Sequence, residues 1–584
     1  MRVNKPKAHR FAESPVLQLR MPAWRSRFVA LMLLLGFAAL VGRSFYLQII
    51  NNDFLQEKGD SRYRRELDVF ASRGRITDRN GEILAVSTPM KSIWAIPGDV
   101  KLTPEQSQRL AALLEIDERE LKRRLAEDRN FVYLKRQIPP EIGERIAQMK
   151  LAGIHQDKEY RRYYPSGEMT AHIVGFTGID DKGLEGVELA FQNQLMGHDG
   201  SRTVIKDRRG QVVEDVGAAK PPQDGKDITL ALDSKIQYLA FSQLQKTVQD
   251  NDAKGGGAVV VDARNGEILA LANWPTYNPN NRQHLTGPQL RNRAVTDTFE
   301  PGSPMKPFTV SLALEKSRVQ PGTIIHCAPG RLTIGTATIN DSHAHGDLSV
   351  AQVIQKSSNV GTAKIAATLS YQEMWENFQN LGFGQVPHLG FPGEVTGRVR
   401  PWKNWRPIEQ ATMSYGHGIS VSLVQLIHAY TVFARDGDVV PLSLTRVGDG
   451  PVPGKRVFSP QTVQEMRNML ELVVQPGGTA PMAKVPGYRV GGKTGTAYKL
   501  ENGVYAKKYV ASFVGIAPMS NPRLIVAVMI DEPSNGKHYG GDVAGPAFAN
   551  IMGGALRVLG IPQDAPQTAG DKPAAAEDSA KEVM

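Results

Sequence analysis

The stretch Phe299-Glu-Pro-Gly-Ser-Pro-Met-Lys306 places a serine directly after a Pro-Gly break and a lysine three residues beyond that serine. Ser303 is a good helix N-cap and Pro304 suits the first helical position, so the sequence predicts a helix from Ser303 to Glu315. On such a helix Lys306 lies on the same face as Ser303, within reach of its hydroxyl. Taken alone, this serine would be interpreted as an ordinary helix cap.

Two further strings change that interpretation. Ser357-Ser-Asn359 and Lys493-Thr-Gly-Thr496 follow in this order, and each occurs once. A serine hydroxyl becomes a good nucleophile only when a nearby base takes its proton. A second serine can relay that proton, an asparagine can hold a substrate amide, and the Lys-Thr-Gly-Thr string offers a positive charge and hydroxyls to a carboxylate. The three strings together are typical of a serine acyl-transfer site.

Another serine–lysine pair with the same spacing is present at Ser534-Asn-Gly-Lys537. It contains Gly536 and follows the apolar run Leu524 to Ile530. We therefore interpret it as a solvated turn and not as a nucleophile site.

The three strings resemble those of the class B penicillin-binding proteins, specifically the cell-division type, the FtsI-like peptidoglycan D,D-transpeptidases. The resemblance covers nearly the whole chain beyond its apolar N-terminal segment. It implies an enzyme that cross-links the stem peptides of the bacterial (septal) cell wall and is a target of β-lactam antibiotics. Further strings that carry it are Arg73-Gly-Arg-Ile-Thr-Asp-Arg-Asn-Gly81, Arg162-Tyr-Tyr-Pro165, Gly183-Leu-Glu-Gly-Val-Glu188 and Tyr277-Asn-Pro-Asn-Asn281.

The resemblance also implies roles for single residues. Ser303 would attack the penultimate D-Ala carbonyl of a stem peptide ending in D-Ala-D-Ala, Lys306 would be the general base, and Ser357 would shuttle a proton to the leaving amine. The backbone N–H groups of Ser303 and Thr496 would form the oxyanion hole. The expected substrate-binding residues are Asn359, Lys493, Thr494, Gly495 and Thr496.

Other functions fit parts of the pattern. A class A β-lactamase would show Ser-Asp-Asn and a deacylating Glu on an E-x-x-L-N loop, whereas here the middle residue is Ser358 and no such Glu string follows. The alternative from another class is a membrane-anchored β-lactam sensor or a non-catalytic divisome scaffold. A complete set of acyl-transfer residues favours the enzyme.

Two histidines stand where the resemblance leads us to expect tyrosine: His417 in Tyr415-Gly-His-Gly418 and His538 in Lys537-His-Tyr-Gly540. Because histidine titrates between about pH 5 and 8, one hypothesis is a specialised paralogue that favours acidic surroundings. Neutral variation at tolerant aromatic positions is the alternative. Tyr505 and Tyr509 are expected to form an aromatic wall near the acyl group, with strand packing as the alternative.

The composition agrees with an anchored globular protein. The chain has 584 residues, 41% hydrophobic and 22% charged, which predicts two folded domains. Its net charge is +11, and the segment before residue 28 contributes +6 of it, with seven basic residues and one Glu. No nucleic-acid-binding motif accompanies this charge, so no nucleic-acid partner is expected.

Phe28 to Ile50 is apolar apart from a few residues such as Arg43, and is long enough to cross a bilayer. We see no convincing signal-peptidase site, so an uncleaved signal anchor in the bacterial inner membrane is predicted. The basic N-terminus places that end in the cytoplasm and the catalytic part in the periplasm. By resemblance, a SEDS-family lipid II polymerase and other divisome membrane proteins are the expected partners.

The predicted fold is α+β and multidomain, with an antiparallel sheet flanked by helices, like the serine β-lactamases, in the C-terminal domain. Asn80-Gly81 and Asn265-Gly266 each predict a hairpin turn. The expected domains are a cytoplasmic tail (1–27), a transmembrane anchor (28–50), an elongated N-terminal pedestal resembling the dimerisation domain (51–222), a transpeptidase domain (223–560) and a disordered tail (561–584). In the transpeptidase domain we expect a strand at Ala258–Asp262, a hairpin turn in Arg264–Ala270 that leads into the next strand, further strands at Tyr488–Ala497, Tyr509–Ala517 and Leu524–Ile530, and helices at Ser349–Thr368, Val421–Ala434 and Val543–Leu559.

The single cysteine, Cys327, excludes an intramolecular disulfide. His343 and His345, with Asp341 and Asp347 close by, raise the question of a metal site. The segment has the composition of a loop and no third ligand is evident, so neither a metal nor a cofactor is expected.

Overall fold

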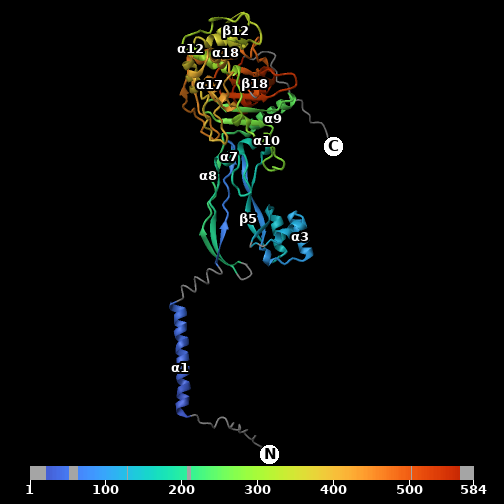
Figure 1. Cartoon of the computed structure of the whole chain (residues 1–584), viewed down its shortest axis with the longest axis vertical. Coiled ribbons are helices and arrows are strands. Elements are labelled where there is room, and N and C mark those ends of the chain that lie inside the picture. Colours follow the sequence, from blue (N-terminus) through green and yellow to red (C-terminus); the bar gives the residue numbers. More distant parts are fainter. Residues whose placement is uncertain are drawn as a thin grey trace, which may run out of the picture. The chain divides into compact units, whose positions relative to one another are not determined.

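The computed structural model describes residues 22–50, 64–127, 129, 131–206, 212–501 and 503–565 (Figure 1). The chain divides into two compact units. The first comprises residues 1–70 and 199–222, and the second comprises residues 71–198 and 223–584. Most of the predicted cytoplasmic tail, and the C-terminal tail from residue 566, lie outside the described residues.

The first unit contains the apolar helix α1 (Ala23–Phe45), which a short π-helical turn (Tyr46–Ile50) continues. The segment Ala23–Ile49 is long and apolar enough to cross a membrane, and none of it is buried in the structure. The helix therefore begins five residues before the predicted anchor. A small antiparallel sheet completes this unit, with strands β1 (Arg64–Val69), β6 (Gly200–Lys206) and β7 (Val212–Lys220).

The N-terminal part of the second unit is built on a mixed sheet in the order β4-β3-β2-β8, with β5 paired to β3. One buried ion cluster lies beside this sheet: the carboxylate of Glu188 is 2.6 Å from the Nε atoms of both Arg73 and Arg162. The strands are β2 (Ile76–Thr77), β3 (Ile83–Ala95), β4 (Val132–Ile138), β5 (Ile154–Tyr163) and β8 (Ile228–Thr229). Helices α3 (Pro104–Leu114), α4 (Glu118–Leu125) and α5 (Pro140–Gln148) share a separate hydrophobic core with β3 and β4.

A five-stranded antiparallel sheet in the order β10-β9-β19-β18-β17 forms the centre of the C-terminal part. Helices α9 (Ser234–Asp250) and α19 (Gly540–Val558) pack on each other and on the sheet, and α17 (Leu423–Ala434) packs against β9 and β19 (Figure 1). This confirms the expected antiparallel sheet flanked by helices. The strands are β9 (Gly255–Asp262), β10 (Ile268–Trp274), β17 (Gly491–Glu501), β18 (Val504–Ala517) and β19 (Leu524–Asp531).

The shorter elements surround these two sheets. Both predicted Asn-Gly turns are present, and Gly81 and Gly266 have positive φ angles of 89° and 76°. The remaining elements are α6 (Ala171–Val174), α7 (Gly186–Ala190), α8 (Gln192–Leu195), α10 (Gly287–Leu290), α11 (Arg293–Thr296), α12 (Lys306–Glu315), α13 (Val350–Lys356), α14 (Asn359–Ala366), α15 (Tyr371–Asn380), α16 (Pro407–Met413), α18 (Pro460–Leu472), β11 (Ile324–His326), β12 (Arg331–Ile334), β13 (Ala337–Asn340), β14 (Asp347–Ser349), β15 (Asp438–Val439) and β16 (Lys455–Arg456).

Two sequence predictions about helices are wrong in detail. The helix expected from Ser349 to Thr368 is two helices, α13 and α14, because Ser357 adopts a left-handed conformation with φ of 59°. Ser303 is not an N-cap: Gly302 takes that position, and Ser303 begins a short 3-10 turn ahead of α12. Both departures fall at predicted catalytic residues.

The expected C-terminal tail begins too early. Ile561 is buried, and the carboxylate of Asp564 accepts the backbone N–H of Arg489 at 2.7 Å and that of Ser520 at 3.0 Å. Residues 561–565 therefore belong to the folded part of the chain.

Candidate active site

The catalytic turn, residues 302–305, carries the predicted nucleophile Ser303. It lies between β17 and α12. Gly302, with φ of 64°, donates its N–H to the carbonyl of Gly416 at 3.3 Å and precedes Ser303. Ser303 is partly exposed, whereas Lys306, the first residue of α12, is fully buried. The turn thus presents the serine hydroxyl to solvent and the lysine to the interior.

Ser357 connects the predicted nucleophile to two lysines. Its Oγ lies 3.0 Å from the Oγ of Ser303, 3.1 Å from the Nζ of Lys306 and 2.9 Å from the Nζ of Lys493. Among the residues that the structure describes, Lys306 makes no direct hydrogen bond to Ser303. The hydroxyl of Ser357 is therefore the group through which a proton can pass between Ser303 and either amine.

Both lysines are held in a medium that disfavours their charge. Burial, reinforced by the nearby charge of Lys493, lowers the pKa of Lys306 well below its usual range, although Asp341 opposes the shift. Burial lowers the pKa of Lys493 to about 7. Because the two amines repel each other when both are protonated, a neutral amine is accessible beside Ser357 near neutral pH.

Asp341 holds the loop that carries Ser357, and sequence reasoning missed this role. Its carboxylate accepts a hydrogen bond from the hydroxyl of Ser358 at 2.7 Å and from the backbone N–H of Val360 at 3.0 Å. It also accepts the N–H of Asn359. The sequence analysis weighed Asp341 only as a neighbour of a metal site. A carboxylate that accepts N–H groups at the start of α14 is an anchor of helix-cap type, and no spacing in the sequence reveals it.

Asn359 begins α14 at the rim of the site. Its side-chain amide N–H donates to the carbonyl of Asn340 at 2.9 Å. Within the described residues its amide oxygen has no hydrogen-bond partner, so this oxygen can accept a further hydrogen bond.

The string on β17 lies beside the catalytic turn. Lys493 and Thr494 are buried, and the hydroxyl of Thr494 is 3.0 Å from that of Thr479. The hydroxyl of Thr496 accepts the N–H of Gly540 at 2.9 Å. These contacts orient the side chains along the edge strand of the sheet, which has an unpaired backbone on its outer side.

Gly495 has a structural requirement of its own. A Cβ at this position would lie 2.2 Å from the Oγ of Ser512, 2.9 Å from the carbonyl oxygen of Pro301 and 3.0 Å from the Cδ of Pro304. The resemblance implied only that this glycine belongs to the substrate-binding residues. The structure adds that the catalytic turn itself packs directly on the backbone of β17.

This packing also bears on the predicted oxyanion hole. A Cβ on Gly302 would lie 3.7 Å from the carbonyl oxygen of Thr496 and 3.6 Å from the Cβ of Ala497. The backbones of Ser303 and Thr496 are therefore neighbours at the mouth of the site, which is the arrangement that two convergent N–H donors require.

The four aromatic positions fall into two groups. The ring of His417 lies 5.2 Å from that of Tyr415 and 6.0 Å from that of Tyr505, and the Nζ of Lys306 lies 6.0 Å from the Tyr415 ring. Tyr509 instead stacks on His538, with the ring centroids 4.3 Å apart. The structure brings His417 and Tyr505 together but leaves Tyr509 and His538 in a separate stack.

His417 is not placed to respond to mild acid. Burial, reinforced by the charge of Lys306, lowers the pKa of His417 to about 4. The ring is therefore neutral between pH 5 and 8, which argues against the acid-switch hypothesis at this position.

The described residues contain no group of three His, Cys, Asp or Glu side chains that could hold a metal ion. His343 and His345 lie in the loop between β13 and β14, where Asp341 already serves the loop of Ser357. Cys327 is buried.

These features define a serine acyltransferase of the penicillin-interacting type: a serine at a helix start, a second serine between two buried lysines, and a threonine-bearing edge strand. Residues 256–553 match the penicillin-binding protein transpeptidase domain, and residues 68–230 match the penicillin-binding protein dimerisation domain. The family matches of both domains thus agree with the class of enzyme that the fold and the site indicate.

Individual relatives agree over most of the chain. The probable peptidoglycan D,D-transpeptidase PenA of Neisseria gonorrhoeae is 45% identical, covering 93% of this chain and 94% of the relative. The peptidoglycan D,D-transpeptidase FtsI of Escherichia coli is 42% identical, covering 94% of each. The solved transpeptidase domain of Burkholderia pseudomallei penicillin-binding protein 3 is 52% identical with a TM-score of 0.54, covering 58% of this chain and 98% of that domain.

The chain belongs to the family of penicillin-binding peptidoglycan D,D-transpeptidases that includes FtsI and PenA. It is a serine-type transpeptidase that acts on peptidoglycan stem peptides and binds β-lactams, as the resemblance implied. Its apolar helix α1 and its cell-division relatives indicate a membrane-anchored protein.

Proposed function

We propose that Ser303 is the acyl-enzyme nucleophile, activated by Lys306 through the hydroxyl of Ser357. The observation that carries this proposal is the position of the Ser357 Oγ, 3.0 Å from Ser303 and 3.1 Å from Lys306. The low pKa of Lys306, caused mainly by burial, supplies a neutral amine to accept the proton.

The first half-reaction then proceeds as follows. The Oγ of Ser303 attacks the penultimate D-Ala carbonyl while its proton passes by way of Ser357 to Lys306. The N–H groups of Ser303 and Thr496 stabilise the oxyanion, and Asn359 holds the peptide backbone. When the C–N bond breaks, the proton returns through Ser357 to the leaving nitrogen, and terminal D-Ala departs as an amine.

The carboxylate of that terminal D-Ala is held by the string on β17. Lys493 supplies positive charge, and the hydroxyls of Thr494 and Thr496 supply hydrogen bonds, with Gly495 keeping the strand close to the turn. In the second half-reaction an amine of a neighbouring stem peptide attacks the ester carbonyl, loses a proton through the same relay, and releases the Ser303 hydroxyl. The product is an amide cross-link.

The proposal also covers membrane orientation, domain organisation and partners. The N-terminus lies in the cytoplasm and the transpeptidase domain in the periplasm, because basic residues precede α1. The chain comprises a pedestal (51–222) and a transpeptidase domain that begins at residue 223 and includes the folded residues 561–565. It works beside a SEDS-family polymerase and other divisome membrane proteins, with α1 and the pedestal as the contact surfaces.

The chemistry is tested with a thioester acyl donor and D-alanine as the acceptor amine. Wild type is expected to release thiol and form the amide product, and Ser303→Ala is expected to do neither. Thiol release with hydrolysis alone, or rapid hydrolysis of a penicillin, would point to a β-lactamase-like enzyme. No release by a folded wild-type protein would favour the sensor or scaffold.

A further inference from the structure

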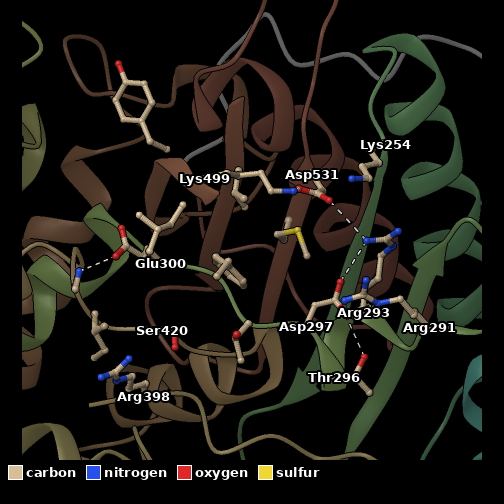
Figure 2. Close-up of a pocket in the computed structure, with 18 of the residues that line it drawn as sticks. Lys254, Arg291, Arg293, Thr296, Asp297, Glu300, Arg398, Ser420, Lys499 and Asp531 are labelled. Atoms are coloured by element: carbon tan, nitrogen blue, oxygen red, sulfur yellow. Dashed lines mark hydrogen bonds and ion pairs between the residues drawn. The ribbon is translucent and has the colours of Figure 1, made fainter. Parts of the chain in front are cut away.

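A cleft of about 980 Å³ lies next to the catalytic turn, and no step above uses it. Its lining includes Glu300, three residues before Ser303, and Tyr498, two residues after Thr496. The cleft is therefore lined by the segment that leads into the turn and by the edge strand, and Figure 2 shows Glu300 and Lys499 among its lining residues. Its size suits a ligand group of a few residues.

Most charges at one end of the cleft are already paired. The carboxylate of Asp297 lies 2.7 Å from Arg291 and 3.2 Å from Arg293. The carboxylate of Asp531 lies 2.7 Å from Lys499 and 3.6 Å from Arg293. These groups satisfy one another, and Figure 2 shows them gathered away from Glu300.

The other end contains two charges that lack such partners. The carboxylate of Glu300 accepts the N–H of Gly418 at 2.8 Å and the hydroxyl of Tyr505 at 3.1 Å, and neither donor is a cation. Arg398 has an exposed side chain. Within the described part of the chain, neither Glu300 nor Arg398 forms an ion pair.

Both residues, Glu300 and Arg398, are bound to one loop. Gly418, which binds Glu300, is followed two residues later by Ser420, whose carbonyl accepts the N–H of Arg398 at 2.8 Å. Figure 2 shows Glu300 and Arg398 on the same side of the cleft, with Ser420 close to Arg398. Burial raises the pKa of Glu300, so an ammonium group beside this carboxylate would offset the cost of its charge.

We propose that Glu300 and Arg398 bind the ammonium and the carboxylate of a zwitterionic amino-acid group carried by a stem peptide. The inference rests on the proposed function, because the stem peptide is the ligand of the adjoining turn. A diamino acid with an amine and a carboxylate on its terminal carbon has this chemistry, whereas lysine ends in an ammonium group alone. The group belongs either to the acyl donor or to the acyl acceptor.

Matched peptides separate these two sources. In the donor arm, pentapeptides ending in D-Ala-D-Ala carry meso-diaminopimelate or L-lysine as the third residue, with D-alanine as acceptor. In the acceptor arm, the same two residues are placed in tetrapeptide acceptors, and the donor is a thioester that lacks them. Wild type is expected to prefer diaminopimelate about tenfold in KM in one arm, the value of one charge-assisted contact.

Two variants and a control assign that preference to the cleft. Arg398→Gln is expected to raise the KM of the diaminopimelate peptide to that of the lysine peptide. Glu300→Gln is expected to raise the KM of both peptides. Arg557→Gln, an exposed arginine on α19 outside the cleft, keeps the wild-type preference. Loss of preference in the donor arm assigns the group to the donor, and loss in the acceptor arm assigns it to the acceptor.

A preference in neither arm, or one that survives Arg398→Gln, overturns the proposal. Penicillin acylation of Ser303 is measured in every preparation, together with the melting temperature. Absence of acylation in wild type would contradict the proposed function itself, and is thereby separated from failure of the zwitterion site.

Discussion

Ser357 has a backbone φ of 59° and a hydroxyl that contacts Ser303, Lys306 and Lys493. A side chain in the left-handed region costs about 1 kcal/mol, and such strain is commonly found at functional positions. The conformation ends α13 and turns the hydroxyl toward Ser303. Asp341 stabilises the loop in this geometry by accepting hydrogen bonds from the three residues that follow Ser357.

Two substitutions at Ser357 separate backbone strain from chemistry. Ser357→Ala and Ser357→Gly both remove the relay hydroxyl, so each should slow acylation by about 10²–10⁴. Glycine adopts a positive φ without penalty, so the free energy of unfolding of Ser357→Gly should exceed that of Ser357→Ala by about 1 kcal/mol. Urea unfolding and penicillin acylation rates check both parts. Near-normal acylation in either variant would contradict the relay.

In the proposed mechanism the two lysines set the pH dependence of acylation. Lys306 must be neutral to act as base, so the rate rises as pH increases through its low pKa. Lys493, with a pKa lowered to about 7 by burial, is charged below that pH and loses its charge above it. The rate constant for acylation should therefore fall as pH increases beyond about 7. Lys493→Arg keeps the charge and should move this descending limb to higher pH.

The control for this profile is His417→Tyr. Because the pKa of His417 is lowered to about 4, the variant should leave both limbs unchanged between pH 5 and 8. A descending limb that Lys493→Arg leaves in place would contradict the assignment to Lys493. A limb that moves in His417→Tyr would restore the histidine hypothesis.

At the scale of elements, β17 and the catalytic turn act as one unit. Gly495→Ala would push a methyl group into Ser512 and Pro301, so it should cost about 1–3 kcal/mol of stability and slow acylation by shifting the turn. Gly287→Ala is a suitable control, because a Cβ at that position has nothing within 4 Å. Thermal unfolding and acylation rates are the measurements. An unchanged melting temperature and acylation rate in Gly495→Ala would show that the turn does not pack tightly on β17.

The elements that sequence predicted well are those fixed by a local pattern. The apolar runs give β9, β18, β19 and α17, and the Asn-Gly pairs give both hairpin turns, because a continuous apolar run and turn chemistry each act within a few residues. The break between α13 and α14 could not be predicted in this way. Ser358 caps α14 by accepting the N–H of Gly361, which is a weak local signal, but the left-handed conformation of Ser357 is held by Asp341 from another segment.

The same distinction applies to the site. The three predicted catalytic strings could be found from the sequence, because residue type and spacing indicate the chemistry they can perform. The pKa of His417, and the separation of Tyr509 from Tyr505, depend on burial and on which strands meet, so a sequence string cannot supply them. The zwitterion cleft likewise combines residues more than 100 positions apart, from Lys254 to Asp531.

At the scale of the whole molecule, the part of the pedestal in the second compact unit shares a hydrophobic core with the transpeptidase domain. Leu84 and Val187 belong to the same buried cluster as Leu232 and Ile236. The boundary expected at residue 222 therefore does not separate two hydrophobic cores in this unit. The buried ion cluster of Glu188, Arg73 and Arg162 lies in the pedestal part of this same unit.

Glu188→Gln tests the weight of that cluster. It leaves Arg73 and Arg162 buried with one fewer negative charge, so the free energy of unfolding should fall by about 3–5 kcal/mol. Glu118→Gln, which breaks an exposed pair with Lys122, should change it by less than about 1 kcal/mol. Denaturant unfolding compares the two. Equal effects would show that burial adds nothing to the ion pairs of Glu188.

The central claim is that Ser303 forms the acyl-enzyme. Intact-mass measurement and peptide mapping after incubation with a penicillin test it most directly, using wild type and Ser303→Ala. A stable adduct is expected on the peptide that contains Ser303, and none is expected in the folded Ser303→Ala variant. An adduct at another residue, or one that persists in Ser303→Ala, would contradict it.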